Sequence, residues 1–195
     1  MKKLLITGFE PFGGETINPS WEAVLRLPDE INAYRLAKIR IPVVFLEGAR
    51  RVIDEAMREE PDVVLCIGQA GGRAAITPEL VGINLRHGSI PDNNGNMPQD
   101  ESILQGGDAA YFSTLPVRRI AEAIQAAGID ARVSYSAGAY VCNDVLYTLL
   151  AHFRGSHTRV GFLHVPYSTE QGKEPCMELD AIVTALTVAI EHLDD

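Results

Sequence analysis

The sequence predicts an α/β fold, arranged as a single domain over residues 1–195 with a mostly parallel sheet covered by helices on both faces. Stretches with the pattern of strands alternate with stretches with the pattern of helices along the chain. The strand-like stretches are continuous apolar runs, which is typical of parallel strands buried on both sides. The 195 residues, 46% of them hydrophobic, suffice for one sizeable core and hardly for two. No repeat, linker or low-complexity segment divides them.

Each expected strand is a short apolar run that ends at a turn signal. The first run stops at Gly8, and the last is stopped by Pro166. The clearest run is 62–67, in which we interpret Cys66 as a core residue. The expected strands are residues 2–7, 35–43, 62–67, 80–85, 131–135 and 159–164.

Five segments have the apolar spacing of amphipathic helices, and residues near their ends support the assignment. Asn18 is the expected N-cap of the first helix, with Pro19 at its first helical position. Pro61 ends the second helix, and Gly128 is the expected C′ residue of the third. The apolar residues of the first helix are Trp21, Val24, Leu25 and Leu27. The other expected helices are 46–59, 115–127, about 140–154, and 177–193.

Charge and cysteine content limit the partners and the setting of the protein. A formal net charge of −9 argues against nucleic acid and anionic membrane as partners, because both would repel the chain. No apolar run approaches the length of a membrane span, and the first residues do not have the pattern of a signal peptide. Three scattered cysteines favour a reduced, intracellular setting. No Cys-x-x-Cys or His-x-x-x-His pair offers a metal site.

Cys142 is the candidate nucleophile. It follows an expected strand and the small-residue turn 136–139, and it falls in the first turn of the helix that starts near Tyr140. Unpaired N–H groups and the helix dipole favour an anion there, so we expect the pKa of the thiol to be lowered. The alternative is that Cys142 is only a small buried apolar residue.

His164 is the histidine best placed to serve as its base. It ends the strand that follows the Cys142 helix, and a strand–helix–strand unit brings both strand carboxyl ends to one edge of the sheet. A hydrogen-bonded core histidine is the alternative, and His87 in the long loop remains possible. The other three histidines are too far along the helix or are expected to be solvated: His152, His157 and His192.

Glu79 could lie at the same edge and orient the imidazole, as a third group does in such sites. Taken by itself, the residue is better explained as a solvated loop carboxylate or a helix cap, and Asp92 and Asp144 compete for the orienting role.

Two glycine-rich turns also leave strand ends at this edge. Gly8-Phe-Glu-Pro-Phe-Gly-Gly14 carries Phe9 and Phe12, which either plug the core or line an apolar ligand pocket. The second turn begins at Gly68-Gln69. Residues from four separate segments are therefore expected to converge beside Cys142. The long polar stretch 87–107 is of the kind that is usually functional or mobile.

Several sequence blocks together resemble pyroglutamyl peptidase type I, also called pyrrolidone-carboxylate peptidase. The blocks occur in the family's order and extend from Met1 to about Gln171. They are Gly8-Phe-Glu-Pro-Phe-Gly-Gly14 with Asn18-Pro-Ser20, Gly68-Gln-Ala-Gly-Gly-Arg73, Ile83-Asn84 with Ile90-Pro-Asp-Asn93, Ala137-Gly138 with Val141-Cys-Asn143, and Gly161-Phe-Leu-His-Val-Pro-Tyr167.

The resemblance implies a cytoplasmic cysteine peptidase that removes an N-terminal pyroglutamyl residue from peptides through a thioester. It implies a three-layer α/β/α sandwich with a twisted sheet, a homotetramer, and no metal or organic cofactor. It places the catalytic triad on Glu79, Cys142 and His164. Substrate binding falls to Phe9 and Phe12 for the ring face, to Gln69, whose backbone bonds the lactam, and to Val141 at the start of the Cys142 helix.

One position departs from the family pattern. Ser89 stands where the family commonly has an arginine near the catalytic centre, and Arg86 and Arg73 are the residues that could compensate.

Two other functions fit the same residues. A glutaminase-like amidase also uses cysteine, histidine and glutamate, and would act on free glutamine. A non-catalytic domain could bind a small ligand between Phe9 and Phe12, with Cys142 and His164 structural. A nucleoside- or phosphate-binding enzyme is less supported, because the glycine turns lack a phosphate-binding lysine.

Overall fold

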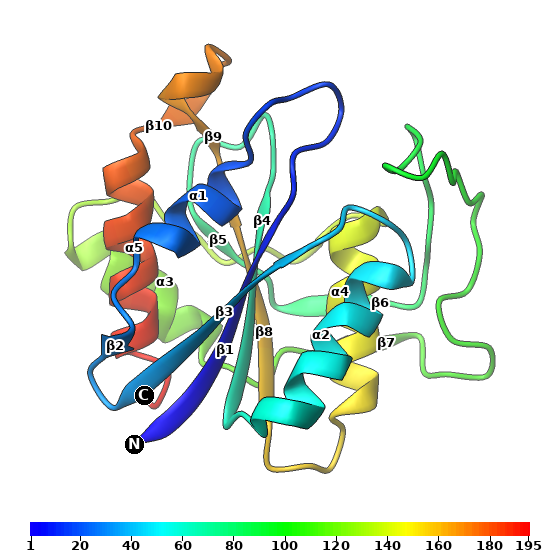
Figure 1. The fold of residues 1–195 in the computed structure, drawn as a ribbon, viewed down its shortest axis with the longest axis horizontal. Helices are drawn as coiled ribbons and strands as arrows, with labels where there is room; N and C mark the ends of the chain where they lie inside the picture. Colours follow the sequence, from blue (N-terminus) through cyan, green and yellow to red (C-terminus); the bar gives the residue numbers. More distant parts are fainter.

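A computed structural model describes residues 1–195, which form three layers. A twisted six-stranded sheet lies in the middle, and helices cover both of its faces (Figure 1). The strand order is β2-β3-β1-β4-β8-β5. The predicted α/β/α sandwich is therefore confirmed.

The four central strands of the sheet are parallel, and a short antiparallel strand closes each edge. This explains the continuous apolar runs, because the central strands are covered on both sides. The strands are β2 (Glu30–Ile31), β3 (Tyr34–Ile41), β1 (Lys2–Phe9), β4 (Val63–Gln69), β8 (Arg159–Val165) and β5 (Thr77–Pro78).

Two smaller strand pairs lie outside this sheet, and most of their residues carry no strand signal in the sequence. β6 (Val81–Ile83) pairs with β7 (Ala110–Phe112), and β9 (Tyr167–Ser168) pairs with β10 (Cys176–Met177). A 3₁₀ turn, Thr169–Gln171, follows β9.

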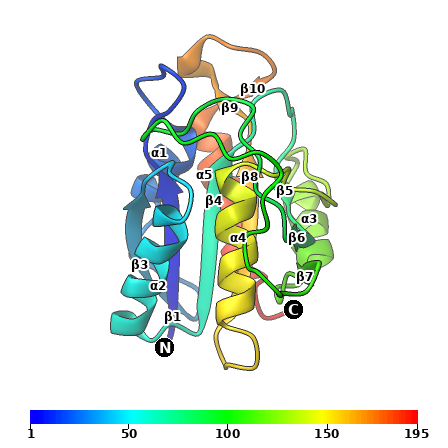
Figure 2. The same cartoon turned by 90° about the vertical axis from the view of Figure 1, so that its right-hand side faces the viewer.

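The helices separate into two layers, which Figures 1 and 2 show on opposite sides of the sheet. One layer holds α1 (Pro19–Arg26), α3 (Val117–Ala126) and α5 (Leu179–Glu191), and the other holds α2 (Glu47–Glu59) and α4 (Val141–His152). Alternate residues of each strand enter different cores. Leu4 and Ile6 pack with the first layer, whereas Leu5 packs with the second. No helix is both long and apolar enough to cross a membrane.

The expected helix caps are present at both tested ends. Asn18 is the N-cap of α1, and its side chain accepts a hydrogen bond from the Ser20 backbone N–H. Gly128 follows α3 with φ +82°, and its N–H donates to the carbonyl of Gln125 while that of Ile129 donates to Ile124. This pair of bonds is a Schellman motif, which satisfies two carbonyls at the helix end.

The prediction of a strand at 131–135 is wrong. Ala131 and Ser134 form only isolated parallel bridges, with Ile76 and Glu79 respectively. Since β5 runs antiparallel to β8, the 131–134 segment also runs antiparallel to β8. The strand–helix–strand unit used to place His164 beside Cys142 is therefore absent. The apolar pattern of the segment arises because it packs at the sheet edge, where the ladder is too short for a regular strand.

The predicted strand at 80–85 is mostly wrong for a similar reason. Only β6, three residues long, is regular within it, and its partner β7 lies outside the main sheet.

The apolar residues expected on the first helix are not all buried. Val24 and Leu27, the C-cap residue directly after α1, are buried, with Leu27 3% exposed, but Leu25 is 50% exposed.

We predict that Leu27→Ala lowers the free energy of unfolding by about 2–4 kcal/mol, since it removes a buried side chain and leaves a cavity. Leu25→Ala is the matched control and should change that free energy by less than about 0.5 kcal/mol. Urea unfolding of both variants measures the difference. Equal losses in the two variants would contradict the assignment of Leu27 to the core.

Candidate active site

The first turn of α4 presents free backbone N–H groups beside a thiol. Cys142 is the second residue of the helix, and Tyr140, at the N-cap, makes no side-chain capping bond. The N–H groups of Val141, Cys142 and Asn143 have no hydrogen-bond partner within the chain. Such groups are ready donors for a negatively charged oxygen.

Two buried side chains of the same turn hold it in place. The Asn143 amide accepts from the Ile83 N–H at 3.0 Å and donates to the Ile83 and Leu85 carbonyls at 2.9 Å. Asp144 accepts from the Arg86 guanidinium at 2.5 and 2.8 Å and from the Leu46 N–H at 2.8 Å. Asp144 is therefore occupied by Arg86, which removes it as a partner for the imidazole.

Asp92 has a structural role as well. It is 5% exposed, and burial raises the pKa of its carboxyl. Hydrogen bonds from the Asn96 side-chain amide and from the N–H groups of Phe45, Asn96 and Asn94 outweigh burial and hold that pKa below the ordinary value. These bonds order the start of the 87–107 stretch. The adjacent Asn93 then donates to Glu10 Oε1 at 2.8 Å, which ties this stretch to the loop that follows β1.

His164 and Glu79 form a buried hydrogen bond. The Nδ1 atom of His164 lies 2.7 Å from Glu79 Oε1, and the two residues are 3% and 0% exposed. His164 is near the carboxyl end of β8, and Glu79 follows β5, the antiparallel neighbour of β8. The backbone also joins them, because the Glu79 N–H donates to the Phe162 carbonyl at 2.9 Å. Glu79 is thus neither a solvated loop residue nor a helix cap.

Gly68 allows the thiol to approach this strand end. It pairs with His164 across β4 and β8. A Cβ atom at Gly68 would lie 3.0 Å from Cys142 Sγ and 2.7 Å from the Phe162 ring. The Phe162 ring in turn lies 4.8 Å from the His164 ring, centroid to centroid, and the two side chains share one face of β8. The absent Cβ of Gly68 therefore leaves the space in which thiol, ring and imidazole gather.

Arg73 is the cationic group at this site. Its Nη1 donates to Glu79 Oε1 at 2.7 Å. Burial by itself would raise the pKa of the Glu79 carboxyl. The hydrogen bond and charge of His164, the nearby polar side chain of Ser134 and the hydrogen bond from Arg73 outweigh burial and hold that pKa below its ordinary value. Glu79 is therefore a carboxylate at neutral pH.

The expected lowering of the thiol pKa is not what the structure shows. The residue Cys142 is partly exposed, but its thiol is enclosed, and this burial, with the charge of Glu79, raises the thiol pKa to about 12. No hydrogen bond links the thiol to His164, whose bonding partner is Glu79. The helix N-terminus alone does not offset desolvation in the absence of a bonded imidazolium.

Three of the four residues expected to bind substrate line one small cavity with Cys142. Its volume is about 40 Å³, and the residues around it are Phe9, Phe12, Asn18, Val43, Gln69, Tyr140 and Cys142. Phe9 is only 2% exposed, so it both fills the core and forms a wall of the cavity. The fourth expected residue, Val141, has its side chain buried between α4 and the sheet. Only its backbone N–H is available to a ligand.

Tyr140 is a cavity residue that the sequence analysis does not identify. Its ring packs edge-on against Phe45 with centroids 5.2 Å apart, and its hydroxyl donates to the Pro91 carbonyl at 3.1 Å. Its position directly before the Cys142 helix is the only sequence signal that could have indicated it. Asn18 and Val43 likewise carry no signal of a ligand site.

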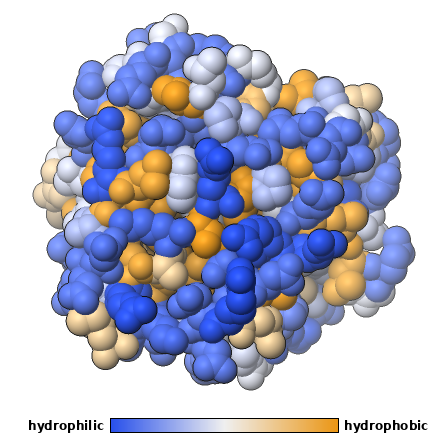
Figure 3. Space-filling model, in the orientation of Figure 1, coloured by the Kyte–Doolittle hydropathy of each residue, from blue (hydrophilic) through white to orange (hydrophobic).

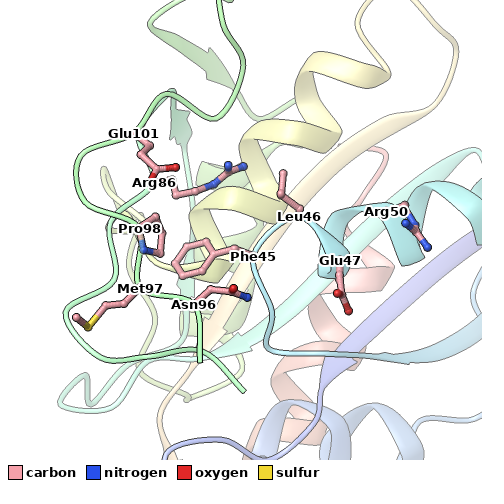
Figure 4. A pocket seen from close by; sticks show the side chains of 9 residues that line it. All are labelled: Phe45, Leu46, Glu47, Arg50, Arg86, Asn96, Met97, Pro98 and Glu101. Atoms are coloured by element: carbon pink, nitrogen blue, oxygen red, sulfur yellow. The ribbon is translucent and has the colours of Figure 1, made fainter. Parts of the chain in front are cut away.

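A much larger hollow lies elsewhere in the structure. Figure 4 shows it between the start of α2 and the 87–107 stretch, with a volume of about 620 Å³. Arg86 and Glu101 line it, but Cys142, His164 and Glu79 do not.

The structure also shows where Ser89 lies, which stands in place of the family's arginine, and which of the two nearby arginines could compensate for it. Ser89 is exposed, and Arg86 is paired with Asp144. Arg73 is the one that contacts the His164–Glu79 pair.

Comparison with known proteins identifies one family. A family model described as pyroglutamyl peptidase matches residues 2–194. The pyrrolidone-carboxylate peptidase of Lactobacillus helveticus is 47% identical over 194 residues, covering 97% of each chain. That of Thermococcus onnurineus is 49% identical over 195 residues, again covering 97% of each. The crystal structure of Bacillus amyloliquefaciens pyroglutamyl peptidase I has a TM-score of 0.95 at 46% identity, covering 99% of this chain and 97% of that one.

The lowered pKa of Glu79 makes its contribution to stability dependent on pH. A carboxyl with a lowered folded-state pKa stabilises the fold above its unfolded pKa, and this contribution is lost as the pH falls through the folded value. We predict that Glu79→Gln lowers the free energy of unfolding by about 1–3 kcal/mol at pH 7. The gap to the parent protein should narrow progressively below about pH 4.5.

Urea unfolding of both proteins between pH 7 and pH 3.5 measures this gap. Glu122→Gln, at an exposed site on α3, is the matched control and should follow the parent at every pH. A gap that stays constant through this range would contradict an ionised, stabilising Glu79.

Proposed function

The chain belongs to the pyroglutamyl peptidase family, and from this premise we propose that it removes the N-terminal pyroglutamyl residue from peptides with Cys142, His164 and Glu79 as its catalytic triad. The observation that carries the assignment of the triad is the buried His164–Glu79 hydrogen bond. It lies at the strand end next to Gly68, where the Cys142 sulfur approaches the chain.

The proposed reaction begins with attack of the Cys142 sulfur on the pyroglutamyl carbonyl carbon. His164 accepts the thiol proton on Nε2 and then donates it to the departing peptide amine, which leaves a thioester on Cys142. A water molecule, deprotonated by the same nitrogen, hydrolyses the thioester and releases pyroglutamate. Glu79 accepts the Nδ1–H of His164 throughout, and so keeps Nε2 free to accept a proton.

The raised pKa of the thiol determines when its proton leaves. A thiol with a pKa of about 12 is neutral at pH 7, so proton transfer to His164 accompanies the attack instead of preceding it. When substrate is bound, a hydrogen bond between the thiol and the imidazole then stabilises the developing thiolate, which has no such bond in the resting site.

The oxyanion and the lactam ring have separate binding groups in this proposal. The free N–H groups at the start of α4, including that of Val141, bind the tetrahedral oxyanion. Pyroglutamate has no charged amine, and so its ring suits the apolar walls formed by Phe9 and Phe12. Gln69 at the end of β4 supplies polar contacts to the lactam through its backbone.

Family membership favours this function over a glutaminase-like amidase or a non-catalytic ligand-binding domain. Free glutamine has a charged α-amine, for which the apolar cavity offers no carboxylate partner.

The proposal extends to organisation and setting. We propose one catalytic domain over residues 1–195, supported by a single sheet shared by both helix layers and by the family match to 2–194. We also propose a cytoplasmic protein, supported by three cysteines that are all free. A homotetramer is supported by apolar side chains that remain exposed on α2 and near it, among them Leu46, Met57 and Leu104.

The tetramer can be tested by measuring the mass of the protein in solution. The face in Figure 3 is largely hydrophilic, with apolar side chains in small separate groups. Light scattering during gel filtration should give about four times the 21.2 kDa mass of one chain. A mass of one chain at micromolar concentration would contradict the tetramer and leave the catalytic proposal unaffected.

We predict that Cys142→Ser lowers kcat/KM for pyroglutamyl-aminomethylcoumarin by about 10³-fold or more without lowering the midpoint of unfolding, because the hydroxyl is a far weaker nucleophile at this site. Release of fluorescent aminomethylcoumarin measures the rate. Cys176→Ser is the matched control and should retain the parent rate, since Cys176 lies in β10. Substantial hydrolysis by the Cys142→Ser protein would exclude Cys142 as the nucleophile.

The reaction class has its own test. Iodoacetamide should abolish hydrolysis by the parent protein, and free glutamine should release no ammonia. A folded, reduced parent protein that does not hydrolyse the pyroglutamyl substrate would contradict the proposed function.

A further inference from the structure

We propose that Arg73 is a positioning residue for the reaction: its guanidinium holds the Glu79 carboxylate toward His164 and keeps a positive charge near Cys142. This inference rests on the proposed roles of Glu79, His164 and Cys142.

The guanidinium of Arg73 is bound by two separate segments, 77–79 and 134–136. Its Nη1 donates to Glu79 Oε1 and Thr77 Oγ1, both at 2.7 Å, and to Ser134 Oγ at 3.3 Å. Its Nη2 donates to the Ser136 carbonyl at 3.0 Å. Arg73 thus joins β5, Glu79 and the 134–136 segment, and several simultaneous bonds fix the direction of its planar group.

The Glu79 carboxylate depends on this contact for its orientation. Oε1 accepts from both His164 and Arg73, whereas Oε2 is buried without any hydrogen-bond partner. Both hydrogen bonds to the carboxylate are therefore made by Oε1. Without Arg73, the carboxylate keeps its bond to His164 but can turn about that bond, because nothing holds Oε2.

The glycine-rich turn before Arg73 brings it back over the strand ends. A Cβ on Gly71 would lie 2.1 Å from the Tyr167 hydroxyl oxygen, so a side chain there would have to displace that ring. Gly72 has φ +86°, a conformation that side chains disfavour, and the Arg73 N–H closes the turn by donating to the Ala70 carbonyl at 3.3 Å. The turn is therefore shaped to place Arg73 beside Glu79.

The charge of Arg73 opposes that of Glu79 at the thiol. Negative charge on Glu79 raises the pKa of Cys142, and positive charge on Arg73 lowers it. The other ionisable groups around the thiol are Cys66 on β4, Tyr140 before α4 and His164 on β8. None of these is a permanent cation. Replacing Arg73 by a neutral residue should therefore make the thiolate harder to form.

The test compares Arg73→Gln and Arg73→Lys in the full chain. Alkylation of Cys142 by iodoacetamide is followed from pH 6 to pH 10 by mass spectrometry of the peptide that contains it. We expect Arg73→Gln to move this pH profile upward by about one unit, so that alkylation at a fixed lower pH slows about tenfold. We also expect its kcat for pyroglutamyl-aminomethylcoumarin to fall about 10- to 100-fold with little change in KM.

Arg73→Lys separates charge from geometry. Lysine keeps the positive charge but cannot present a planar group to Glu79, Thr77 and Ser134 together. We therefore expect the alkylation profile of the parent protein with a kcat about tenfold lower. Arg119→Gln on α3 removes the same charge at an exposed site, and it should leave both the profile and kcat unchanged.

Two results would overturn the proposal. One is a folded Arg73→Gln protein whose alkylation profile coincides with that of the parent, since a purely structural role would slow the enzyme without moving the profile. The other is an Arg73→Lys protein with the full parent kcat, which remains informative if Arg73→Gln does not fold. Alkylation of Cys142 requires no turnover, so the pH profile tests the role of Arg73 even in an inactive enzyme. Failure of the proposed peptidase function would show separately, as a parent protein that does not hydrolyse the substrate.

Discussion

The site depends on the hydrogen bond between His164 and Glu79, a carboxylate that is completely buried. A buried carboxylate is costly unless hydrogen bonds and opposite charge compensate for its lost hydration. His164 and Arg73 provide that compensation on one oxygen, and their effect on the pKa exceeds the effect of burial. Much of the surrounding architecture serves this pair. β5 brings Glu79 alongside β8, the 68–73 turn carries Arg73 over it, and the 134–136 segment holds Arg73 from the other side.

The parallel sheet determines where this pair can meet the thiol. Strands β4 and β8 place Gly68 beside His164, and the missing side chain of Gly68 admits the Cys142 sulfur. Asn143 and Asp144 then fix the first turn of α4 through backbone and ion-pair contacts that do not use the imidazole. The thiol and the imidazole are therefore positioned by different elements, and each element has its own anchors. This separation leaves the thiol enclosed and neutral at rest, beside the free N–H groups at the start of the helix.

Most of the fold follows from signals that are local in the sequence. The central strands and all five helices follow from apolar periodicity, and the caps at Asn18 and Gly128 follow from the chemistry of single residues. Residues 131–135 are the exception, because their apolar pattern predicted a strand that would have made a parallel crossover. The segment pairs instead with 76–79 at the sheet edge. The prediction that His164 lies near the Cys142 helix was based on that crossover. The location is correct, but the structure reaches it through the pairing of β4 with β8 and not through the predicted crossover.

The sequence by itself determined the elements of this protein and the residue types at their ends: a cysteine in the first turn of a helix, a histidine at the end of a strand, and glycines where the chain must turn. These are consequences of periodicity and local backbone chemistry, which act over a few residues. The pKa of the thiol, the choice of Glu79 over Asp92 and Asp144, and the position of Arg73 were decided only by the tertiary structure. Desolvation and charge pairing depend on which groups from distant segments meet in space, and no spacing along the chain encodes that directly.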